Sequence, residues 1–424
     1  MGMVQPETIL SANVGLAEDY WNIPPYYDEP KLFHIYVKLK LDPSVGSHDE
    51  YGDASGTSLS RSRALWKAAG EAIERYCLFP KRAPEAPKPY ADLEAEAALN
   101  PDLIVAGEHP GGSSSRHNEP LCWTAGFNAI SGDPVQVPQQ LVDVPHSFRE
   151  GETIIRPPIT TGAAAGNSRE KALLRGTCEV IERDAFMMAW LRKWQLRHLS
   201  GRLIGQVAEQ NELLVSLLRA TKRYRFEPKF YIIPTDAPAW VVMCVLVDST
   251  RHKPLFTLGA RCSLNAADAL FGALEEAHQL RPWIRSLSEE YDENTEVTDP
   301  KTLKERALLW LSNSAEEQLM EWLQFADTID QLDSDSKADS LSEVMSEVKN
   351  ATFLASDVNH RLPSRIRDMG FNTMKSVIPE FQPLYLTESL RDIAWERISF
   401  VERNLDINSP FPKGFINEFP HPFL

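Results

Sequence analysis

Two short segments of the sequence repeat one arrangement of acidic and basic residues, Glu-x-x-Glu-Arg. The first runs from Glu71 to Arg75 and the second from Glu179 to Arg183. On an α-helix, residues three apart lie about 60° apart around the axis, so the two glutamates of each segment share a face. The arginine, four residues after the first glutamate, can form an ion pair with it. One such segment alone is typical of a solvated helix face, but its recurrence needs another explanation.

Three features separate these segments from an ordinary solvated face. Each has isoleucine at its third position, each lies among apolar residues, and each helix follows a loop of small residues, 52–60 or 160–166. Backbone N–H groups in such loops can approach an anion closely. If the two helices face each other, their carboxylates converge and require hard divalent cations between them. Magnesium suits all-oxygen ligands, whereas a di-iron bundle would need histidines that neither segment has. The expected metal ligands are Glu71, Glu74, Glu179 and Glu182.

The composition is that of a folded globular protein with an uneven charge. The 424 residues are 43% hydrophobic and 25% charged, and the net charge is −16. Most of the acidic excess lies between residues 289 and 347, so the rest of the chain is close to neutral. This balance argues against a nucleic-acid-binding surface, while a local anion site is still allowed. Residues 289–347 are expected to form solvated helices and linkers.

The same survey excludes several other classes of protein. The five cysteines include no Cys-x-x-Cys pair, so neither a disulfide framework nor a zinc knuckle is indicated. The N-terminal residues do not have the basic start and apolar run of a signal peptide. The longest apolar run, residues 240–247, is much shorter than the ~20 residues that a bilayer requires. We therefore expect a cytoplasmic protein that does not bind membranes.

The segments that must position these residues alternate between helix and strand. Asn167 is expected to cap the second glutamate-bearing helix, with Glu170 completing a capping box. Mixed elements without a regular βαβ rhythm predict a single large α/β (α+β) domain. It would comprise a strand-containing segment (1–50) and a main domain (51–424) with an acidic helical insertion at about 288–350 and a proline-rich tail. The expected helices are 61–79, 168–194, 265–280 and 390–404, and the expected strands are 33–41, 228–234, 240–247, 255–260 and 371–379, with a hairpin in 121–144.

The two glutamate segments resemble the nucleotide-binding core of the YcaO family, ATP-dependent enzymes that activate peptide backbone amides. The family's first motif, Ser-x-x-x-Glu-x-x-Glu-Arg, is matched by Glu71, Glu74 and Arg75, with Lys67 in the place of serine. The second motif is matched in register by the residues Asn167, Glu179, Glu182 and Arg183. Two further positions depart from the family pattern: Lys171 replaces a glutamate, and Thr57 replaces a lysine.

The resemblance extends from about residue 30 to the end of the chain. The segment EEAHQLR resembles the family's third block, and IPEFQPL and INEFPHPFL resemble the azoline-forming branch. Members of that branch end in Pro-x-Pro-x-Pro, and here the three positions are Pro420, Pro422 and Leu424. The family match implies a tail that threads toward the active site, where these three residues would act in catalysis.

The resemblance implies ATP and Mg²⁺ as cofactors, with the four glutamates as metal ligands. It also implies a reaction: Cys, Ser or Thr of a ribosomal precursor peptide is cyclodehydrated to thiazoline or oxazoline. A separate protein would bind the leader peptide, an azoline dehydrogenase could follow in the pathway, and the chain could form a homodimer. The residues expected to contact ATP are Asn167, Arg75, Arg183, Gln279 and Arg281.

Two alternatives stay open at this point. One is a YcaO enzyme that forms a thioamide or amidine through the same activation of the amide. The other is a non-catalytic scaffold that binds nucleotide within a peptide-maturation complex. The substitutions at Thr57 and Lys171 favour the scaffold, and the complete glutamate and arginine sets argue against it.

Overall fold

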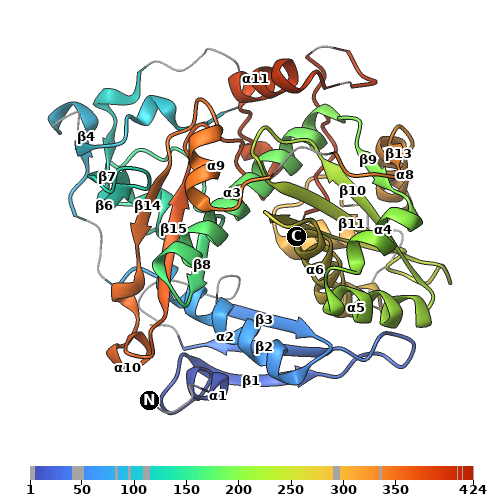
Figure 1. Ribbon diagram of the computed structural model, residues 1–424. Coiled ribbons are helices and arrows are strands. Elements are labelled where there is room, and N and C mark those ends of the chain that lie inside the picture. The colour runs from blue at the N-terminus through green and yellow to red at the C-terminus, as the bar shows by residue number, and fades with distance from the viewer. Residues whose placement is uncertain are drawn as a thin grey trace.

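The computed structural model describes residues 5–40, 52–81, 85–93, 97–107, 115–289, 297–333, 337–407, 409–412 and 414–423. Within these ranges the strands form two five-stranded sheets, one three-stranded sheet and one two-stranded ribbon. Figure 1 shows the three-stranded sheet at one end of the molecule and the two larger sheets side by side above it. The mixed α/β (α+β) class expected from the sequence is confirmed.

The three-stranded sheet carries the first glutamate-bearing helix. The N-terminal strands β1 (Ala17–Ile23) and β2 (Phe33–Leu39) pair antiparallel with each other, and β2 pairs with β3 (Asp53–Ser58). Helix α2 (Arg61–Leu78) packs on β3 and β2 through small buried residues. The short helix α1 (Pro6–Ile9) lies against α2. The strands of segment 1–50 therefore belong to the same sheet as β3.

The second glutamate-bearing helix lies on a sheet in the order β7-β6-β14-β15-β8. Helix α3 (Arg169–Arg192) packs on β15 and β8, and α2 contacts β8 as well. Strand β8 consists only of alanine and glycine, so its small residues let both helices approach it. The strands are β6 (Trp123–Asn128), β7 (Pro134–Pro138), β8 (Ala163–Gly166), β14 (Leu354–Asp357) and β15 (Asn372–Val377), and the ribbon pairs β4 (Lys88–Pro89) with β5 (Pro120–Leu121).

A third helix, α6 (Ala266–Glu289), covers the other five-stranded sheet, whose order is β12-β11-β10-β9-β13. α6 packs chiefly on β12 and β11. The strands are β9 (Arg197–Leu199), β10 (Phe226–Ile233), β11 (Trp240–Asp248), β12 (Phe256–Ser263) and β13 (Asp327–Ile329). The remaining helices are α4 (Gly201–Ala208), α5 (Glu212–Arg223), α7 (Leu303–Leu309), α8 (Asn313–Leu323), α9 (Leu341–Glu347), α10 (Ser364–Arg367) and α11 (Trp395–Leu405).

Most of the expected elements are present, with corrections at both small-residue loops, at the start of α3 and at the end of α6. Both loops contain a strand, because β3 pairs with β2 and β8 pairs with β15. Ser168 caps α3, since its side chain accepts a hydrogen bond from the Lys171 N–H, so the expected Asn167 cap is wrong. Helix α6 continues past residue 280 to Glu289. In the described ranges no helix has both the length and the apolar composition to cross a bilayer.

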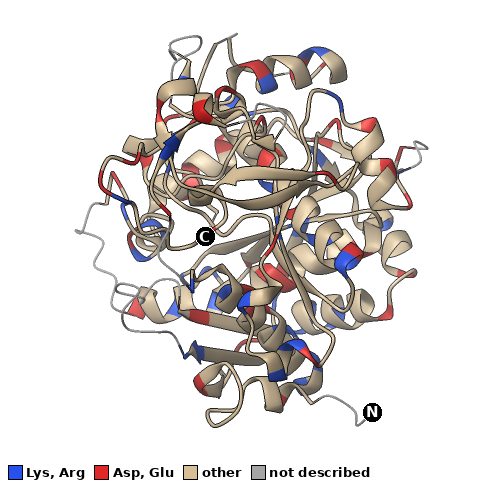
Figure 2. Cartoon of the chain, turned by 90° about the vertical axis from the view of Figure 1, so that its left-hand side faces the viewer, with Lys and Arg blue, Asp and Glu red and all other residues tan. Residues whose placement is uncertain are grey.

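The acidic region is not simply a solvated face. Trp310, directly after α7, and Trp322 of α8 are buried, and their rings meet the ring of Trp190 on α3 at centroid distances of 5.7 and 5.2 Å. The indole N–H of Trp322 donates to the Trp194 carbonyl at 2.8 Å. The expectation of solvated helices is therefore wrong for this apolar side of the insertion. Figure 2 shows acidic and basic residues interspersed over the elements in view.

Candidate active site

Glycines allow all three of the helices α2, α3 and α6 to lie very close to a neighbouring strand or loop. A Cβ added to Gly56 of β3 would lie 2.3 Å from the Ala64 carbonyl of α2, and one added to Gly259 of β12 would lie 2.3 Å from the Ala273 carbonyl of α6. Gly162 adopts φ +91°, a conformation that favours glycine, and its carbonyl faces Gly176 of α3. These contacts fix the three helices against their supports.

Backbone N–H groups at or near these glycines hold the carboxylates. Each of four buried or half-buried glutamates accepts a hydrogen bond from a strand or loop, which orients its side chain. Two of the four donors, Ala260 and Cys262, lie on the same strand, so α3 and α6 direct their carboxylates to one edge of β12. The distances are 3.0 Å for Ser55 N–Glu71 Oε2, 3.1 Å for Gly162 N–Glu179 Oε2, 2.7 Å for Cys262 N–Glu182 Oε2 and 2.8 Å for Ala260 N–Glu276 Oε2.

The arginine of each segment pairs with its own glutamates, as the helical spacing predicts. Arg75 lies 3.4 Å from Glu71, and Arg183 lies 3.7 Å from Glu179 and 3.5 Å from Glu182. Two of their buried nitrogens, Nε of Arg75 and Nε of Arg183, have no hydrogen-bond partner, and Nη1 of Arg183 has only the 3.5 Å ion pair with Glu182. Buried N–H groups without an acceptor are costly. An anion that supplies oxygen acceptors would satisfy them.

Helix α6 contributes acidic residues that the sequence analysis missed. Glu275 and Glu276 are spaced within one turn of Gln279, and this was the available signal in the segment EEAHQLR. Arg261 of β12 lies among Glu182, Glu276 and Glu179, whose charges raise its pKa against the effect of burial. Three helices therefore bring glutamates together, not two.

The pKa values show how much negative charge is concentrated here. Burial raises the pKa of Glu182 to about 7, with Glu276 and Glu179 adding to the increase. Burial and the charge of Glu179 also raise the pKa of Glu74 well above its usual value, and burial raises that of Glu276. Such carboxylates favour protonation unless a cation joins them. This donor set fits Mg²⁺.

The carboxylates are not yet arranged as a closed metal site. Among the described residues, no three His, Cys, Asp or Glu side chains converge closely enough to hold an ion. Their oxygens instead face backbone N–H groups and the arginines. Metal binding would require some of these side chains to turn toward the ion, which the partly exposed Glu71 and Glu179 can do with the least cost.

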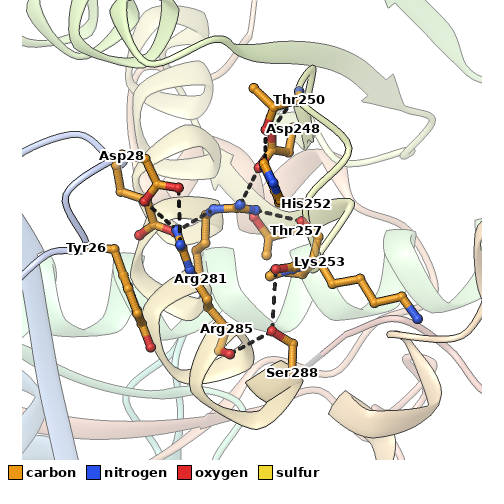
Figure 3. A network of polar contacts seen from close by, with 12 residues as sticks. Tyr26, Asp28, Asp248, Thr250, His252, Lys253, Thr257, Arg281, Arg285 and Ser288 are labelled. Atoms are coloured by element: carbon orange, nitrogen blue, oxygen red, sulfur yellow. Dashed lines mark hydrogen bonds and ion pairs between the residues drawn. The ribbon is translucent and has the colours of Figure 1, made fainter. Parts of the chain in front are cut away.

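Arg281 does not lie with the carboxylate cluster, which is a correction to its expected role. Its guanidinium is buried and donates to Glu29 Oε1 at 3.0 Å, the Pro254 carbonyl at 2.9 Å and Asp248 Oδ2 at 2.8 Å. On a helix it points about 200° away from Gln279, which is two residues earlier. Figure 3 shows Arg281 and Arg285 directed into this polar network beside Asp28. Arg281 thus ties the N-terminal segment to α6, and the phosphate role does not fit the geometry.

The other residues that the family resemblance singled out lie in different surroundings. Gln279 lies at the cluster, since its amide donates to Ser55 Oγ at 2.8 Å. Asn167 and Lys171 are exposed at the start of α3. Thr57 is buried, with its hydroxyl 3.0 Å from Nδ1 of His34, so it has a structural partner where the family has lysine. Whether Asn167 contacts adenosine stays a prediction.

The C-terminal tail reaches the second glutamate segment. Pro420, His421, Pro422 and Phe423 are buried, and the Phe423 ring lies 3.6 Å from the guanidinium carbon of Arg183. The His421 carbonyl accepts from Arg306 at 3.0 Å and from Trp310 at 3.1 Å. Both Figure 1 and Figure 2 show the chain end near the centre of the molecule. Leu424 lies outside the described residues.

A cavity borders Arg183. It is lined by Arg183 and Val180 of α3, by Lys375 of β15, and by Arg156, Phe381 and Gln382. The Lys375 ammonium donates to the carbonyls of Ile159 at 2.7 Å and Thr161 at 2.6 Å. Burial lowers the pKa of Lys375 to about 7, although the nearby Glu179 opposes this.

A sequence model of one family matches residues 55–382, and its description is YcaO cyclodehydratase, ATP- and Mg²⁺-binding. This chain belongs to the YcaO family. The matched range includes both glutamate segments and Glu275 and Glu276 of α6. The cofactors of this family are ATP and Mg²⁺. The carboxylate and arginine sets described above fit both groups.

Solved YcaO proteins share this fold at low sequence identity. A heterocyclase in complex with substrate and cofactor superposes with a TM-score of 0.71 at 16% identity, covering 99% of this chain and 57% of that protein. YcaO from Methanopyrus kandleri, bound with AMPPCP and Mg²⁺, gives 0.62 at 18% identity over 91% of each chain. The E. coli microcin synthetase McbBCD complex with pro-MccB17 bound gives 0.59 at 14% identity, covering 85% of this chain and 88% of that one.

A curated relative is an uncharacterised protein of Methanothermobacter thermautotrophicus, 28% identical over 228 residues. The match covers 54% of this chain and 56% of that protein. The chain therefore spans little more than half the length of this relative and of the heterocyclase.

Proposed function

We propose that this chain uses ATP and Mg²⁺ to activate a backbone amide of a peptide and to cyclise the following Cys, Ser or Thr to an azoline. The observation that carries the proposal is the contact of Phe423 with Arg183. This contact joins a tail of the azoline-branch type to the arginine of the second glutamate segment. The ATP-binding core and the tail are therefore adjacent in space although they are far apart in the sequence.

The side chains have distinct roles in this proposal. Glu71, Glu74, Glu179 and Glu182 hold magnesium, which neutralises phosphate charge when it is bound. Arg75 and Arg183 offer their unpaired nitrogens to phosphate oxygens, a task for which the planar guanidinium is well suited. Gln279, held by Ser55, borders the same site.

The reaction that we propose conserves atoms as follows. The thiol sulfur or the hydroxyl oxygen of the side chain attacks the preceding carbonyl carbon and loses its proton to solvent or a base. The resulting oxyanion takes the terminal phosphoryl group of ATP and releases ADP. The C–O bond then breaks, orthophosphate leaves with the carbonyl oxygen, and the amide N–H proton is lost as the C=N bond forms. Exclusion of water favours this transfer over hydrolysis of ATP.

The cavity beside Arg183 supports the same assignment. It lies between the second glutamate segment and the strand that carries Lys375, and its lining includes Phe381 and Gln382 from the segment that resembles the azoline branch. We propose that the peptide amide enters here. A precursor peptide, a separate leader-binding protein and an azoline dehydrogenase are then the proposed partners.

Mass spectrometry of a co-expressed precursor peptide tests the proposal. Peptides encoded beside the gene would be expressed with the wild-type protein or with Glu179→Gln, together with the neighbouring candidate partners. We expect the loss of one water per modified residue with the wild-type protein only. Exchange of one oxygen for sulfur would instead assign thioamide formation, and an unmodified peptide despite ATP binding would favour the scaffold alternative.

A further inference from the structure

Lys67 connects two of the glutamate-bearing helices. It lies one turn before Glu71 on α2, where the family pattern has serine, and its ammonium forms an ion pair with Glu275 of α6. The Glu275 side chain is only 3% exposed, and that of Lys67 is 32% exposed. A buried carboxylate without a cation is strongly unfavourable. The charge of Lys67 is therefore part of the cluster and not a surface feature.

The packing of α2 and α6 on their strands fixes the position of the Lys67 Cβ relative to the carboxylates. A Cβ added to Gly56 would lie 2.9 Å from the Lys67 Cβ, and one added to Gly259 would lie 2.9 Å from the Glu276 Cβ. Lys67 and Glu276 thus occupy the same place on their helices, directly over the glycine of the supporting strand. Because neither helix can move away without losing this contact, the Lys67 side chain extends from a fixed point toward the carboxylates of α6.

The charges around Lys67 are those that a metal ion would meet. Glu71 and Glu276 attract its ammonium in addition to Glu275, while Arg261 and Arg63 oppose them. The same Glu276 raises the pKa of Glu182, one of the expected magnesium ligands. The ammonium therefore neutralises part of one continuous carboxylate cluster.

We propose that Lys67 takes the place of one divalent cation in this cluster, so that the chain binds its nucleotide with one Mg²⁺ fewer than it would with an uncharged residue at position 67. The inference rests on the proposed function, because it requires a metal–nucleotide site at these helices. It concerns only the number of ions and leaves the reaction unchanged. An uncharged residue at position 67 would leave Glu275 without this ammonium partner.

Counting bound metal tests this inference without measuring activity. Mn²⁺ would be titrated into the protein with AMPPCP, and the bound ions per protein counted by electron paramagnetic resonance at pH 6.5. Burial lowers the pKa of Lys67 to about 7, so the ammonium is largely charged at this pH. The variants are Lys67→Ser, Lys67→Arg as the charge-conserving control, Glu275→Gln, and the double variant Lys67→Ser/Glu275→Gln.

We expect Lys67→Ser to bind one additional Mn²⁺ per site and Lys67→Arg to bind the wild-type number. The double variant should return to the wild-type number, because it loses the cation and its partner together. Lys67→Met keeps the apolar stem and gives the same comparison if the serine variant does not fold.

Two results would overturn the inference and are distinguishable. An unchanged Mn²⁺ count in Lys67→Ser and Lys67→Met, with weaker AMPPCP binding, would make Lys67 a phosphate ligand. An unchanged count with unchanged nucleotide affinity would make it a structural ion pair. If the wild-type protein binds no Mn²⁺ with AMPPCP, the proposed function itself fails.

Discussion

The guanidinium carbon of Arg183 lies 3.6 Å from the centre of the Phe423 ring. This stacking leaves the edge of the guanidinium directed at Glu179 and Glu182, while its face is covered by the tail. Phe423 also packs on Phe186 of α3 at a centroid distance of 5.0 Å. The tail therefore sets the orientation of an arginine that we assign to phosphate.

Phe423→Ala should destabilise the protein and weaken nucleotide binding together. Loss of a buried phenyl ring costs about 3–5 kcal/mol, and a buried cation–π contact contributes up to about 2 kcal/mol of that sum. Urea unfolding and calorimetry with AMPPCP would measure the two effects. Phe423→Leu is the matched control, since it keeps most of the apolar volume without the aromatic face. Full stability in Phe423→Ala would show that the tail is not packed as described.

Removal of His421–Leu424 should lower thermal stability as well as abolish peptide cyclisation. Stability should fall because His421 and Phe423 are buried and the His421 carbonyl accepts two hydrogen bonds. Removing Leu424 alone is the cleaner test, and we expect loss of cyclisation at near-normal melting temperature. We expect Leu424→Pro, which restores the family ending, to cyclise at the wild-type rate.

Arg281→Gln should reduce stability but not nucleotide affinity. It leaves Asp248 and Glu29 buried with fewer cationic partners, and breaking such a pair costs about 3 kcal/mol or more. Arg183→Gln should show the opposite pattern, with weaker AMPPCP binding in a folded protein. Urea unfolding and calorimetry on both variants would separate these roles. A selective loss of nucleotide binding in Arg281→Gln would restore the phosphate role that the geometry argues against.

Glu182→Gln should stabilise the metal-free protein at pH 8 and have little effect at pH 4. The pKa of Glu182 is raised to about 7 in the folded state, so its contribution to stability is present below its unfolded pKa and lost as the pH rises through 7. Glutamine carries no charge, so the variant does not lose this stability as the pH rises. Its amide oxygen can still accept the hydrogen bond from the Cys262 N–H. We expect a gain of about 3 kcal/mol at pH 8, because each unit of the shift corresponds to about 1.4 kcal/mol. Chemical unfolding in the presence of a chelator would measure it, and a less stable variant at pH 8 would contradict the prediction.

The sequence predicted the two glutamate-bearing helices of the site, but not all of the residues that gather there. The spacing of Glu71, Glu74, Glu179 and Glu182 predicted two helices, and both are present because helical periodicity is a local property. The roles of Glu276 and Arg261 could not be derived in this way. They depend on how α6 crosses β12 at Gly259, which is a tertiary contact.

The partners of Arg281 and the buried side of the acidic insertion also depend on tertiary contacts that the local sequence does not predict. Nothing in the local sequence of Arg281 reveals that Glu29, far away in the chain, will supply its partner. The burial of Trp310 and Trp322 was likewise hidden by the charge of the residues around them. Composition predicts the average environment of a segment, and a few large apolar residues can override it.

The central claim is that the glutamate-bearing helices hold a magnesium–nucleotide complex. Calorimetric titration of AMPPCP into the wild-type protein, Glu74→Gln and Glu179→Gln, each with and without Mg²⁺, tests it most directly. Each substitution removes one anionic ligand while keeping the size of the side chain. We predict Mg²⁺-dependent binding by the wild-type protein and at least a tenfold loss of affinity, about 1.4 kcal/mol, in both variants. Equal affinity in all three folded proteins would contradict the account.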